Sequence, residues 1–165
     1  ALLAAYDRRE WKHWIDADHD CQDTRQEVLI AESLTPPVLD ARGCRVLSGT
    51  WVDPYTGITY TDPSALDIDH TIPLKLAALS GGQAWSSDKK QAYANDLTHP
   101  DHLIAIDKRI NRSKGARPIQ EFHPTQPDAR CWYLHVYMGV KRQWDLTYTA
   151  AELDGILCEL RTCDQ

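Results

Sequence analysis

Apolar and polar residues alternate in the middle of the chain, where residues 66–70 read Leu-Asp-Ile-Asp-His. A period of two is typical of a half-buried strand. Pro73 follows, and proline ends strand pairing because it has no N–H to donate. We therefore predict a strand over residues 66–70 that ends with the carboxylate of Asp69 beside the imidazole of His70.

Residues 102–115 carry a second pattern, an apolar run that passes into a polar one. The run His-Leu-Ile-Ala-Ile-Asp predicts another strand, and the residues Lys-Arg-Ile-Asn-Arg-Ser-Lys-Gly that follow predict a short helix. Asp107 is a suitable N-cap for this helix, and Gly115 is a suitable end. The two segments together predict strand, long loop, strand and helix, with polar groups at both junctions.

Apolar residues spaced three and four apart predict helices near both ends of the chain. We expect an amino-terminal helix over residues 2–15, whose Trp11 and Trp14 lie in the core. We also expect a carboxyl-terminal hairpin of two helices against the sheet, the second behind a capping box at Thr149 and Glu152. The apolar stripes of the hairpin are Tyr133, Val136, Tyr137, Val140 and Trp144, then Leu153, Ile156, Leu157 and Leu160.

Turn-forming residues divide the rest of the chain into shorter elements. We predict strands over 45–51 and 57–61 around a turn at 53–57, helices over 74–79 and 88–95, the latter capped by Ser87, and loops over 34–43 and 118–127. The two helices fill the insertion between the strands of the central element. The whole pattern predicts one α+β domain over residues 1–165, with a small antiparallel sheet flanked by amino-terminal and carboxyl-terminal helices.

The cysteine content indicates an oxidising compartment. Five cysteines, six tryptophans and one methionine in 165 residues suit a secreted protein better than a cytosolic one. Five cysteines allow fifteen arrangements of two disulfides, because each of five choices of unpaired thiol leaves three pairings. No apolar run approaches the roughly 20 residues of a membrane span and no leader is recognisable, so we expect a mature soluble protein without a membrane partner.

The charge of the chain is unevenly distributed. A net charge of −6 argues against a nucleic-acid partner, since phosphate binding depends on lysine and arginine. Residues 107–117 nevertheless contain one acid and the bases Lys108, Arg109, Arg112, Lys114 and Arg117. This segment is either a solvated helix face or a basic rim on an acidic body, which would bind nucleic acid weakly and in a salt-sensitive way.

The polar residues at the two junctions resemble the pattern of the HNH endonucleases, whose site is a ββα-metal (His-Me finger) core. In that family Asp-His ends the first strand, a polar residue opens the second, and the helix carries Asn with Lys three places later. The matching positions here are Asp69, His70, His102, Asn111 and Lys114, within a core of about residues 66–115. Over nearly its whole length the chain is similar to secreted nucleases related to the nuclease half of the GmrSD restriction enzymes.

The resemblance implies a metal-dependent, sequence-nonspecific endonuclease that hydrolyses DNA, with RNA as an open second substrate. His70 is the expected general base, because an imidazole with a pKa of about 6.5 can accept a proton from water at neutral pH. Asp69 and Asn111 are expected to hold one divalent metal, and such an open oxygen-only site suits Mg²⁺ or Mn²⁺. Lys114 and Arg112 are expected to contact substrate phosphates.

Four residues near this pattern can each be interpreted in two ways. His102 would either hold the loop of the general base by hydrogen bonding or lie close to the metal. Asp67 would be an acceptor behind the metal ligands or an exposed strand carboxylate. Asn95 would belong to the family pattern or be a helix C-cap, and Arg25 would bind phosphate or form a surface ion pair.

The resemblance also selects one arrangement of the cysteines. It implies the disulfides Cys21–Cys44 and Cys131–Cys163, each closing a loop of a few tens of residues and contributing on the order of 3 kcal/mol. Cys158 would then remain as a small buried hydrophobic residue.

Residues 16–27 suggest a second metal site. Oxygen-bearing side chains occupy positions 1, 3, 5, 7, 9 and 12 of an EF-hand-like loop, although Cys21 stands where that loop normally has glycine. A capping box at Thr24 and Glu27 would explain the same residues as a helix start. We keep as a hypothesis a structural Ca²⁺ held by Asp16, Asp18, Asp20 and Glu27.

Two other functional classes compete with a nuclease. One is a catalytically inert, disulfide-stapled secreted protein that uses the scaffold for binding or as an effector; the presence of Asp69, His70 and Asn111 argues against it. The other is a glycoside hydrolase using Asp67 and Asp69, which suffers because both carboxylates lie on one strand. We expect a monomer, and the sequence does not indicate whether an inhibitor protein exists.

Overall fold

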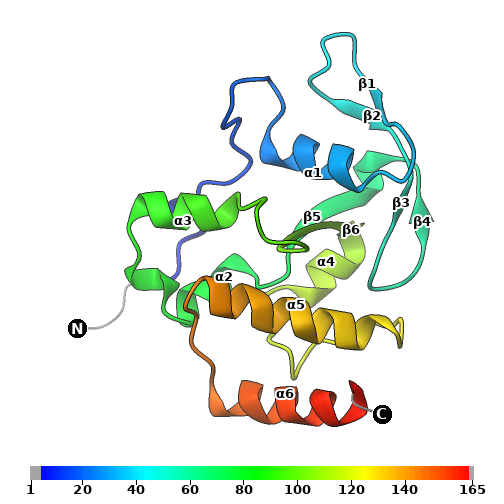
Figure 1. The fold of residues 1–165 in the computed structure, drawn as a ribbon. Coiled ribbons are helices and arrows are strands. Elements are labelled where there is room, and N and C mark those ends of the chain that lie inside the picture. Colours follow the sequence, from blue (N-terminus) through cyan, green and yellow to red (C-terminus); the bar gives the residue numbers. More distant parts are fainter. Residues whose placement is uncertain (1–4, 164–165) are drawn as a thin grey trace.

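The computed structural model describes residues 5–163, and within them the chain forms six α-helices and three antiparallel strand pairs (Figure 1). The predicted α+β class is therefore confirmed. The strand pairs are short, and the longest of them lies between helices on both sides (Figure 1). No helix among residues 5–163 is long and apolar enough to cross a bilayer.

The central unit contains the two strands and the helix that the sequence predicts. Strand β5 (Leu66–His70) pairs antiparallel with β6 (Leu103–Asp107), and α4 (Lys108–Lys114) follows directly. The carboxylate of Asp107 accepts the N–H groups of Arg109 and Ile110, which makes it the N-cap of α4. Gly115 ends the helix with a positive φ of 54°, a conformation that glycine adopts without steric cost.

The insertion between β5 and β6 contains two helices, as predicted. Helix α2 (Leu74–Leu79) has the expected bounds and stops before Gly81, whose φ is 111°. Helix α3 (Ser87–Ala94) begins one residue earlier than expected, because Ser86 rather than Ser87 accepts the N–H of Lys89. The C-terminal end of α3 points toward the start of β6, where the Tyr93 carbonyl lies 2.8 Å from the Nε2 of His102.

The two faces of the β5–β6 pair are covered by different helices (Figure 1). Helix α1 (Thr24–Glu32) covers one face, where Val28 and Leu29 pack with the side chains of Leu66, Ile68, Leu103 and Ala105. The side chains of Ile104 and Ile106 point the other way, into the larger core formed with α5 (Ala129–Gln143). Because successive strand residues alternate between faces, Asp67 and Asp69 lie on the face opposite α1, where α4 is located.

Two small hairpins follow α1 in the chain. Strand β1 (Val38–Leu39) pairs with β2 (Val46–Ser48), and β3 (Trp51–Val52) pairs with β4 (Thr59–Tyr60). The predicted turn is present: the N–H of Gly57 donates to the carbonyl of Asp53 at 2.7 Å, and Gly57 has a φ of 74°. The predicted strand over residues 45–51 is wrong as a single element, since it divides between β2 and β3 and changes partner.

The predicted amino-terminal helix is also wrong within the described residues, and residues 2–4 lie outside them. Only Arg8–Glu10 form a short 3-10 helix, capped by Asp7. Beyond it, Asn95 accepts the N–H of Ile15 and donates to the carbonyl of Lys12, so these groups bond to α3 instead of to a helix of their own. Trp11 is fully buried as expected, whereas Trp14 is only half-buried.

The carboxyl-terminal hairpin is present, with α5 followed by α6 (Ala150–Cys163). The apolar stripe of α5 is buried as predicted, apart from a half-buried Trp144. In α6 the prediction is half wrong, because Leu153 and Leu157 are about half exposed, at 48% and 54%. The helix instead turns Glu152, Ile156 and Glu159 inward, since Glu152 pairs with the buried Lys141 of α5. The capping box of α6 forms as expected.

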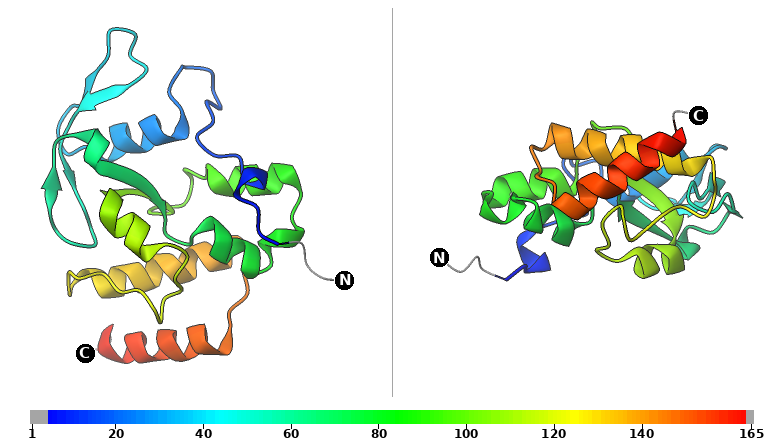
Figure 2. Two further views of the ribbon diagram at one scale, coloured as in Figure 1. Left: turned by 180° about the vertical axis from the view of Figure 1, so that it is seen from behind. Right: turned by 90° about the horizontal axis from the view of Figure 1, so that it is seen from below.

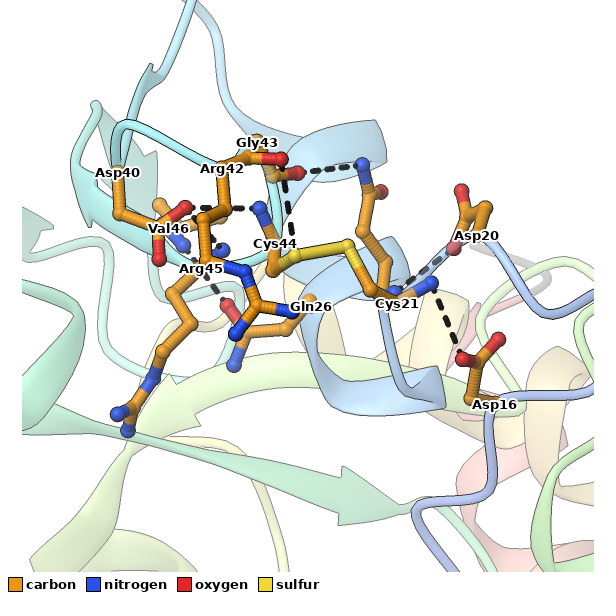
Figure 3. Close-up of a disulfide and its surroundings, with 11 residues drawn as sticks. Asp16, Asp20, Cys21, Gln26, Asp40, Arg42, Gly43, Cys44, Arg45 and Val46 are labelled. Carbon is orange, nitrogen blue, oxygen red and sulfur yellow. Dashed lines mark hydrogen bonds between the residues drawn. A yellow bond between two sulfur atoms is a disulfide. The ribbon is translucent and has the colours of Figure 1, made fainter.

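Both expected disulfides are present. Cys21–Cys44 joins the loop before α1 to the β1–β2 hairpin (Figure 3), and Cys131–Cys163 joins α5 to the end of α6. Cys158 has no disulfide partner, as predicted, but it is exposed, so its expected burial is wrong. It lies on the solvent-facing side of α6, as do Leu153 and Leu157, for the reason given above.

Candidate active site

A cavity of about 340 Å³ opens where β5 ends beside α4. Its walls come from the amino-terminal segment, β5, the start of α2, and α4. The charged and polar residues that line it are Arg8, Asp69, His70, Lys75, Asn111 and Arg112. Three expected site residues, Asp69, His70 and Asn111, therefore meet at one cavity, although Asn111 lies 41 residues after His70 in the sequence.

His70 lines this cavity, and one of its two ring nitrogens is free. Its Nε2 lies 2.9 Å from the carbonyl oxygen of Ala94, and a carbonyl can only accept, so Nε2 carries a hydrogen. In the neutral ring Nδ1 is then an unprotonated acceptor, and it has no hydrogen-bond partner within residues 5–163. Burial, followed by the nearby His102, lowers the pKa of His70 well below its ordinary value, so the ring is neutral at physiological pH.

Two aromatic rings lie nearly parallel to the His70 imidazole. The Trp14 ring is 5.5 Å away between centroids at an angle of 9°, and the Tyr93 ring is 6.4 Å away at 8°. The sequence pattern predicted that Trp14 lies on an amino-terminal helix and packs into the hydrophobic core, and it gave Trp14 no part in the site. Only the irregular path of residues 11–15 brings its ring to His70.

His102 forms a hydrogen bond to α3 next to Ala94, the residue to which His70 donates. Its Nε2 lies 2.8 Å from the carbonyl oxygen of Tyr93, directly before Ala94 in α3. The side chain is fully buried and does not line the cavity, and burial lowers its pKa to about 4. This geometry supports the bracing interpretation of His102 over a position beside a metal.

Asp69 is paired with Lys114 beneath the cavity. The ammonium of Lys114 donates to both oxygens of Asp69 at 3.0 and 2.9 Å, and the hydroxyl of Tyr55 donates to the same carboxylate at 2.8 Å. Lys114 also donates to the carbonyls of His70 and Thr71 and is completely buried. The expected contact of Lys114 with a substrate phosphate is therefore corrected: the side chain turns inward because four acceptors surround it there.

The buried pair carries opposing electrostatic effects. Burial raises the pKa of Asp69 and lowers that of Lys114, because removal from water disfavours both charged forms. The attraction between the two charges works against both shifts. The mutual hydrogen bonds and attraction favour the ionised pair, and the loss of either partner would leave an uncompensated buried charge.

Asn111 faces the cavity from α4 and is oriented by Asp67. The Nδ2 of Asn111 donates to Asp67 at 3.1 Å, which leaves the Asn111 carbonyl oxygen free to bind a cation. The Nε of Arg112 lies 3.7 Å from the same Asp67 carboxylate. Asp67 is therefore a partner of two cavity residues, which supports its role behind the expected ligands rather than as an isolated surface carboxylate.

The donor set at the cavity fits a hard divalent cation. A carboxylate has about four acceptor positions, and Lys114 and Tyr55 use three at Asp69, so one remains. The free carbonyl of Asn111 supplies a second oxygen. Mg²⁺ accepts a site with few protein oxygens and several waters. The Lys114 charge competes with an ion for Asp69, which favours weak rather than tight metal binding.

The cations that line the cavity differ from those expected. Arg112 is in place, but the others are Arg8 from the amino-terminal segment and Lys75 from the first turn of α2. No pattern in the sequence indicated Lys75, which is a single lysine at a helix start. Arg25 fits neither of its interpretations, since it donates to the backbone carbonyls of Pro63 and Leu66.

The acidic loop before α1 forms a separate feature. One carboxylate oxygen from each of Asp16, Asp18 and Asp20 lies within 4.8 Å of the others. Cys21 has a φ of 75°, the left-handed conformation that an EF-hand loop normally assigns to glycine, and its N–H donates to Asp16 (Figure 3). The predicted capping box is wrong at its start, because Asp23 rather than Thr24 caps α1.

Comparison with known proteins identifies the family of the chain. Residues 23–157 match the family model described as GmrSD restriction endonucleases, C-terminal domain. The chain is 35% identical over 158 residues to an uncharacterized secreted protein of Arthroderma benhamiae, covering 96% of this chain and 76% of that protein. No solved structure matches the chain. The two disulfides and the secreted relative indicate that the protein is secreted. The chain belongs to the family of GmrSD restriction endonuclease C-terminal domains.

Proposed function

We propose that this protein is a metal-dependent, sequence-nonspecific endonuclease that hydrolyses phosphodiester bonds of DNA, with RNA as a second substrate to be tested. The observation that carries the proposal is that His70, whose Nδ1 is free, lines the same cavity as Asp69 and Asn111. Family membership supports a nuclease. We assign β5, β6 and α4 as a ββα-metal core of about residues 66–115 within a single domain over residues 1–165.

In this proposal each cavity residue has a defined task. The Nδ1 of His70 accepts a proton from the attacking water, while the Ala94 carbonyl fixes the tautomer that leaves Nδ1 free. Asp69 and Asn111 hold Mg²⁺, or Mn²⁺ in its place, and the bound ion supplies charge stabilisation at the reacting phosphate. Arg112 contacts the phosphate backbone. Lys114 holds the Asp69 carboxylate in position from below instead of touching the substrate.

The proposed lack of sequence specificity follows from the kind of contact that the cavity offers. Its positively charged side chains, Arg8, Lys75 and Arg112, suit phosphate oxygens, and phosphate contacts fix position without reading bases. Recognition of a base sequence would instead need side chains that reach the edges of the bases in a groove. Substrates of unrelated sequence are therefore expected to be cleaved at similar rates.

The test compares cleavage of plasmid, single-stranded DNA and RNA by the wild type and by His70→Ala, with Mg²⁺ and with EDTA. We expect the wild type to cut only with metal, and His70→Ala to lose cleavage while it keeps its circular dichroism spectrum. Asn111→Ala should cut only at a Mg²⁺ concentration raised roughly tenfold, as losses around a metal site commonly do. Cleavage by His70→Ala at the normal rate would disprove the assignment of the base.

A second candidate is a catalytically inert binding or effector protein on the same scaffold. One observation favours it: Lys114 and Tyr55 already occupy three acceptor positions of Asp69, as in a site that has no need of metal. The same experiment decides, because an inert protein leaves all three substrates intact with either Mg²⁺ or Mn²⁺. We also propose that the protein is a monomer.

Structural Ca²⁺ at the acidic loop stays a prediction. Asp16, Asp18 and Asp20 supply the carboxylates, and Glu27 lies close enough that they raise its pKa, after the larger effect of its burial. The loop lies apart from the cavity, so Ca²⁺ there would act on stability and not on the reaction.

A further inference from the structure

We propose that the amino-terminal residues 6–15, which precede the family match at residues 23–157, complete the active site: Trp14 positions the His70 imidazole and Arg8 binds a substrate phosphate. This inference rests on the nuclease function proposed above. It adds to that function a segment that lies outside the residues matched by the family. The segment crosses α3 on its way to the acidic loop (Figure 2).

The backbone at Trp14 is held in an unusual conformation. Its φ is 58°, which a bulky side chain seldom adopts and which costs on the order of 1–3 kcal/mol. Asn95 clamps the chain on both sides of it, since it donates to the carbonyl of Lys12 at 2.8 Å and accepts the N–H of Ile15 at 3.2 Å. Two long-range hydrogen bonds thus hold the indole in the place where it stacks on His70.

The end of α3 serves as a common support for the base and its neighbours. Tyr93 accepts from His102 and places its ring parallel to His70, Ala94 accepts from His70, and Asn95 holds the segment that carries Trp14. Ala94 therefore fixes the imidazole, and the next residue, Asn95 at the C-cap of α3, fixes the backbone that carries the indole. A ring stacked on an imidazole restricts its rotation, and a misplacement of about 1 Å at a reacting group can cost roughly 100-fold in rate.

Arg8 reaches the cavity from the amino-terminal segment, whereas Arg112 reaches it from α4. Its Nη2 lies 3.3 Å from the Nε2 of His13, and the side chain is exposed, so most of its donors are available to a ligand. With Lys114 buried, the cavity lacks one of the cations expected on α4. A guanidinium suits a phosphate because it can donate two parallel hydrogen bonds.

The neighbouring Arg9 provides a matched control for Arg8. It is 90% exposed in its side chain, pairs with Asp7 at 2.7 Å and does not line the cavity. The two arginines have the same charge and are adjacent in the chain. A difference between their variants therefore reports the position of the guanidinium and not the loss of one positive charge.

Trp14 is tested with Trp14→Ala and Trp14→Phe in the full chain. We expect kcat on an oligonucleotide to fall roughly 10- to 100-fold in Trp14→Ala with KM within about twofold, and most of kcat to return in Trp14→Phe. In metal-free protein, the ring-proton NMR signals of His70 should shift more in Trp14→Ala than those of His135, since a stacked indole shields its neighbour. An unchanged kcat or an unshifted His70 signal in folded Trp14→Ala would overturn the positioning role.

Arg8 is tested by fluorescence anisotropy with a labelled single-stranded oligonucleotide in EDTA, where no cleavage occurs. We expect Arg8→Gln to weaken binding about three- to tenfold and to reduce the slope of log affinity against log salt by roughly 0.7, as for one lost phosphate contact. Arg9→Gln should bind like the wild type. Equal binding by Arg8→Gln and Arg9→Gln would overturn the phosphate contact.

The failure of this inference can be told from failure of the proposed function. If the wild type cuts and His70→Ala does not, but Trp14→Ala and Arg8→Gln both match the wild type, only the role of the amino-terminal segment is wrong. If the wild type cuts none of the substrates, the nuclease proposal fails. The NMR measurement then still decides whether Trp14 stacks on His70, because it needs neither metal nor activity.

Discussion

Two buried lysine–carboxylate pairs show how the same interaction serves different ends in this fold. Lys114–Asp69 joins α4 to β5, and Lys141–Glu152 joins α5 to α6, with both ammonium groups fully buried. At the first pair the carboxylate also lines the cavity beside His70. At the second, Tyr137 and the N–H of Thr149 donate to the carboxylate as well, and the Glu152 side chain is enclosed by its neighbours.

The difference lies in what remains free after pairing. Glu152 is surrounded by donors from its own hairpin, so the Lys141 pair closes the interface between two helices. Asp69 keeps one acceptor position and lines a cavity that Arg8, Lys75 and Arg112 also line. We infer that the first pair orients a ligand and the second fixes the angle between helices, and that changes at each should separate stability from metal response.

The largest effect on stability is expected from Lys141→Met. Removal of the ammonium leaves Glu152 charged and buried, which typically costs about 3–5 kcal/mol in unfolding free energy. The cleavage rate of the folded protein should be unchanged. Urea titration measures the first effect, and plasmid cleavage below the unfolding transition measures the second. The double variant Lys141→Met with Glu152→Gln should recover part of the lost unfolding free energy, because it leaves no buried charge. If Lys141→Met alone costs less than about 1 kcal/mol, the pair does not stabilise the hairpin as expected.

Lys114→Met should lose a similar amount of stability, but part of it should return with Mg²⁺. Without the ammonium, Asp69 is a buried anion beside a cavity, and a divalent ion becomes its available counterion. Millimolar Mg²⁺ should therefore raise the melting temperature of Lys114→Met more than that of the wild type. Lys141→Met is the matched control, and an equal Mg²⁺ response of the two variants would show that the pairs do not differ as we infer.

Glu32 provides a partly buried carboxylate that accepts the N–H of Ala105 but forms no ion pair with residues 5–163. Burial raises its pKa from 4.5 to about 7, so the folded state keeps a proton that the unfolded state loses. Stability from this group is thus lost as the pH rises from about 5 to 8, by on the order of 2 kcal/mol. Glu32→Gln should reduce that loss in urea titrations at the two pH values; an identical pH dependence would contradict the raised pKa.

The smallest expected effect is that of Ca²⁺ on the acidic loop, where carboxylates gather without any lysine. Ca²⁺ at Asp16, Asp18 and Asp20 should stabilise the chelator-stripped protein by about 1 to 3 kcal/mol when it exceeds its dissociation constant roughly 10- to 100-fold. The measurement is the melting temperature with and without millimolar Ca²⁺, with Asp18→Asn as control. An unchanged melting temperature would exclude the calcium hypothesis.

The sequence by itself determined the elements whose signals are local. The alternation at residues 66–70 fixed a strand with Asp67 and Asp69 on one face, and Asp107 and Gly115 fixed both ends of α4. The order of Asp69, His70 and Asn111 predicted a shared site, and the structure brings all three to one cavity. The strand and the helix ends depend on period, caps and backbone freedom, which neighbouring residues decide, whereas the shared site was expected from the resemblance to the HNH endonucleases.

The tertiary structure alone decided which polar side chains turn inward. Nothing in the pattern of α4 shows that Lys114 is buried beneath Asp69, or in α6 that Glu152 rather than Leu153 faces the core. The path of residues 11–15 depends on Asn95, which is far away in the chain. Such choices follow from partners distant in sequence, because a buried charge or backbone group goes where a matching group lies, and only the folded chain places the two together.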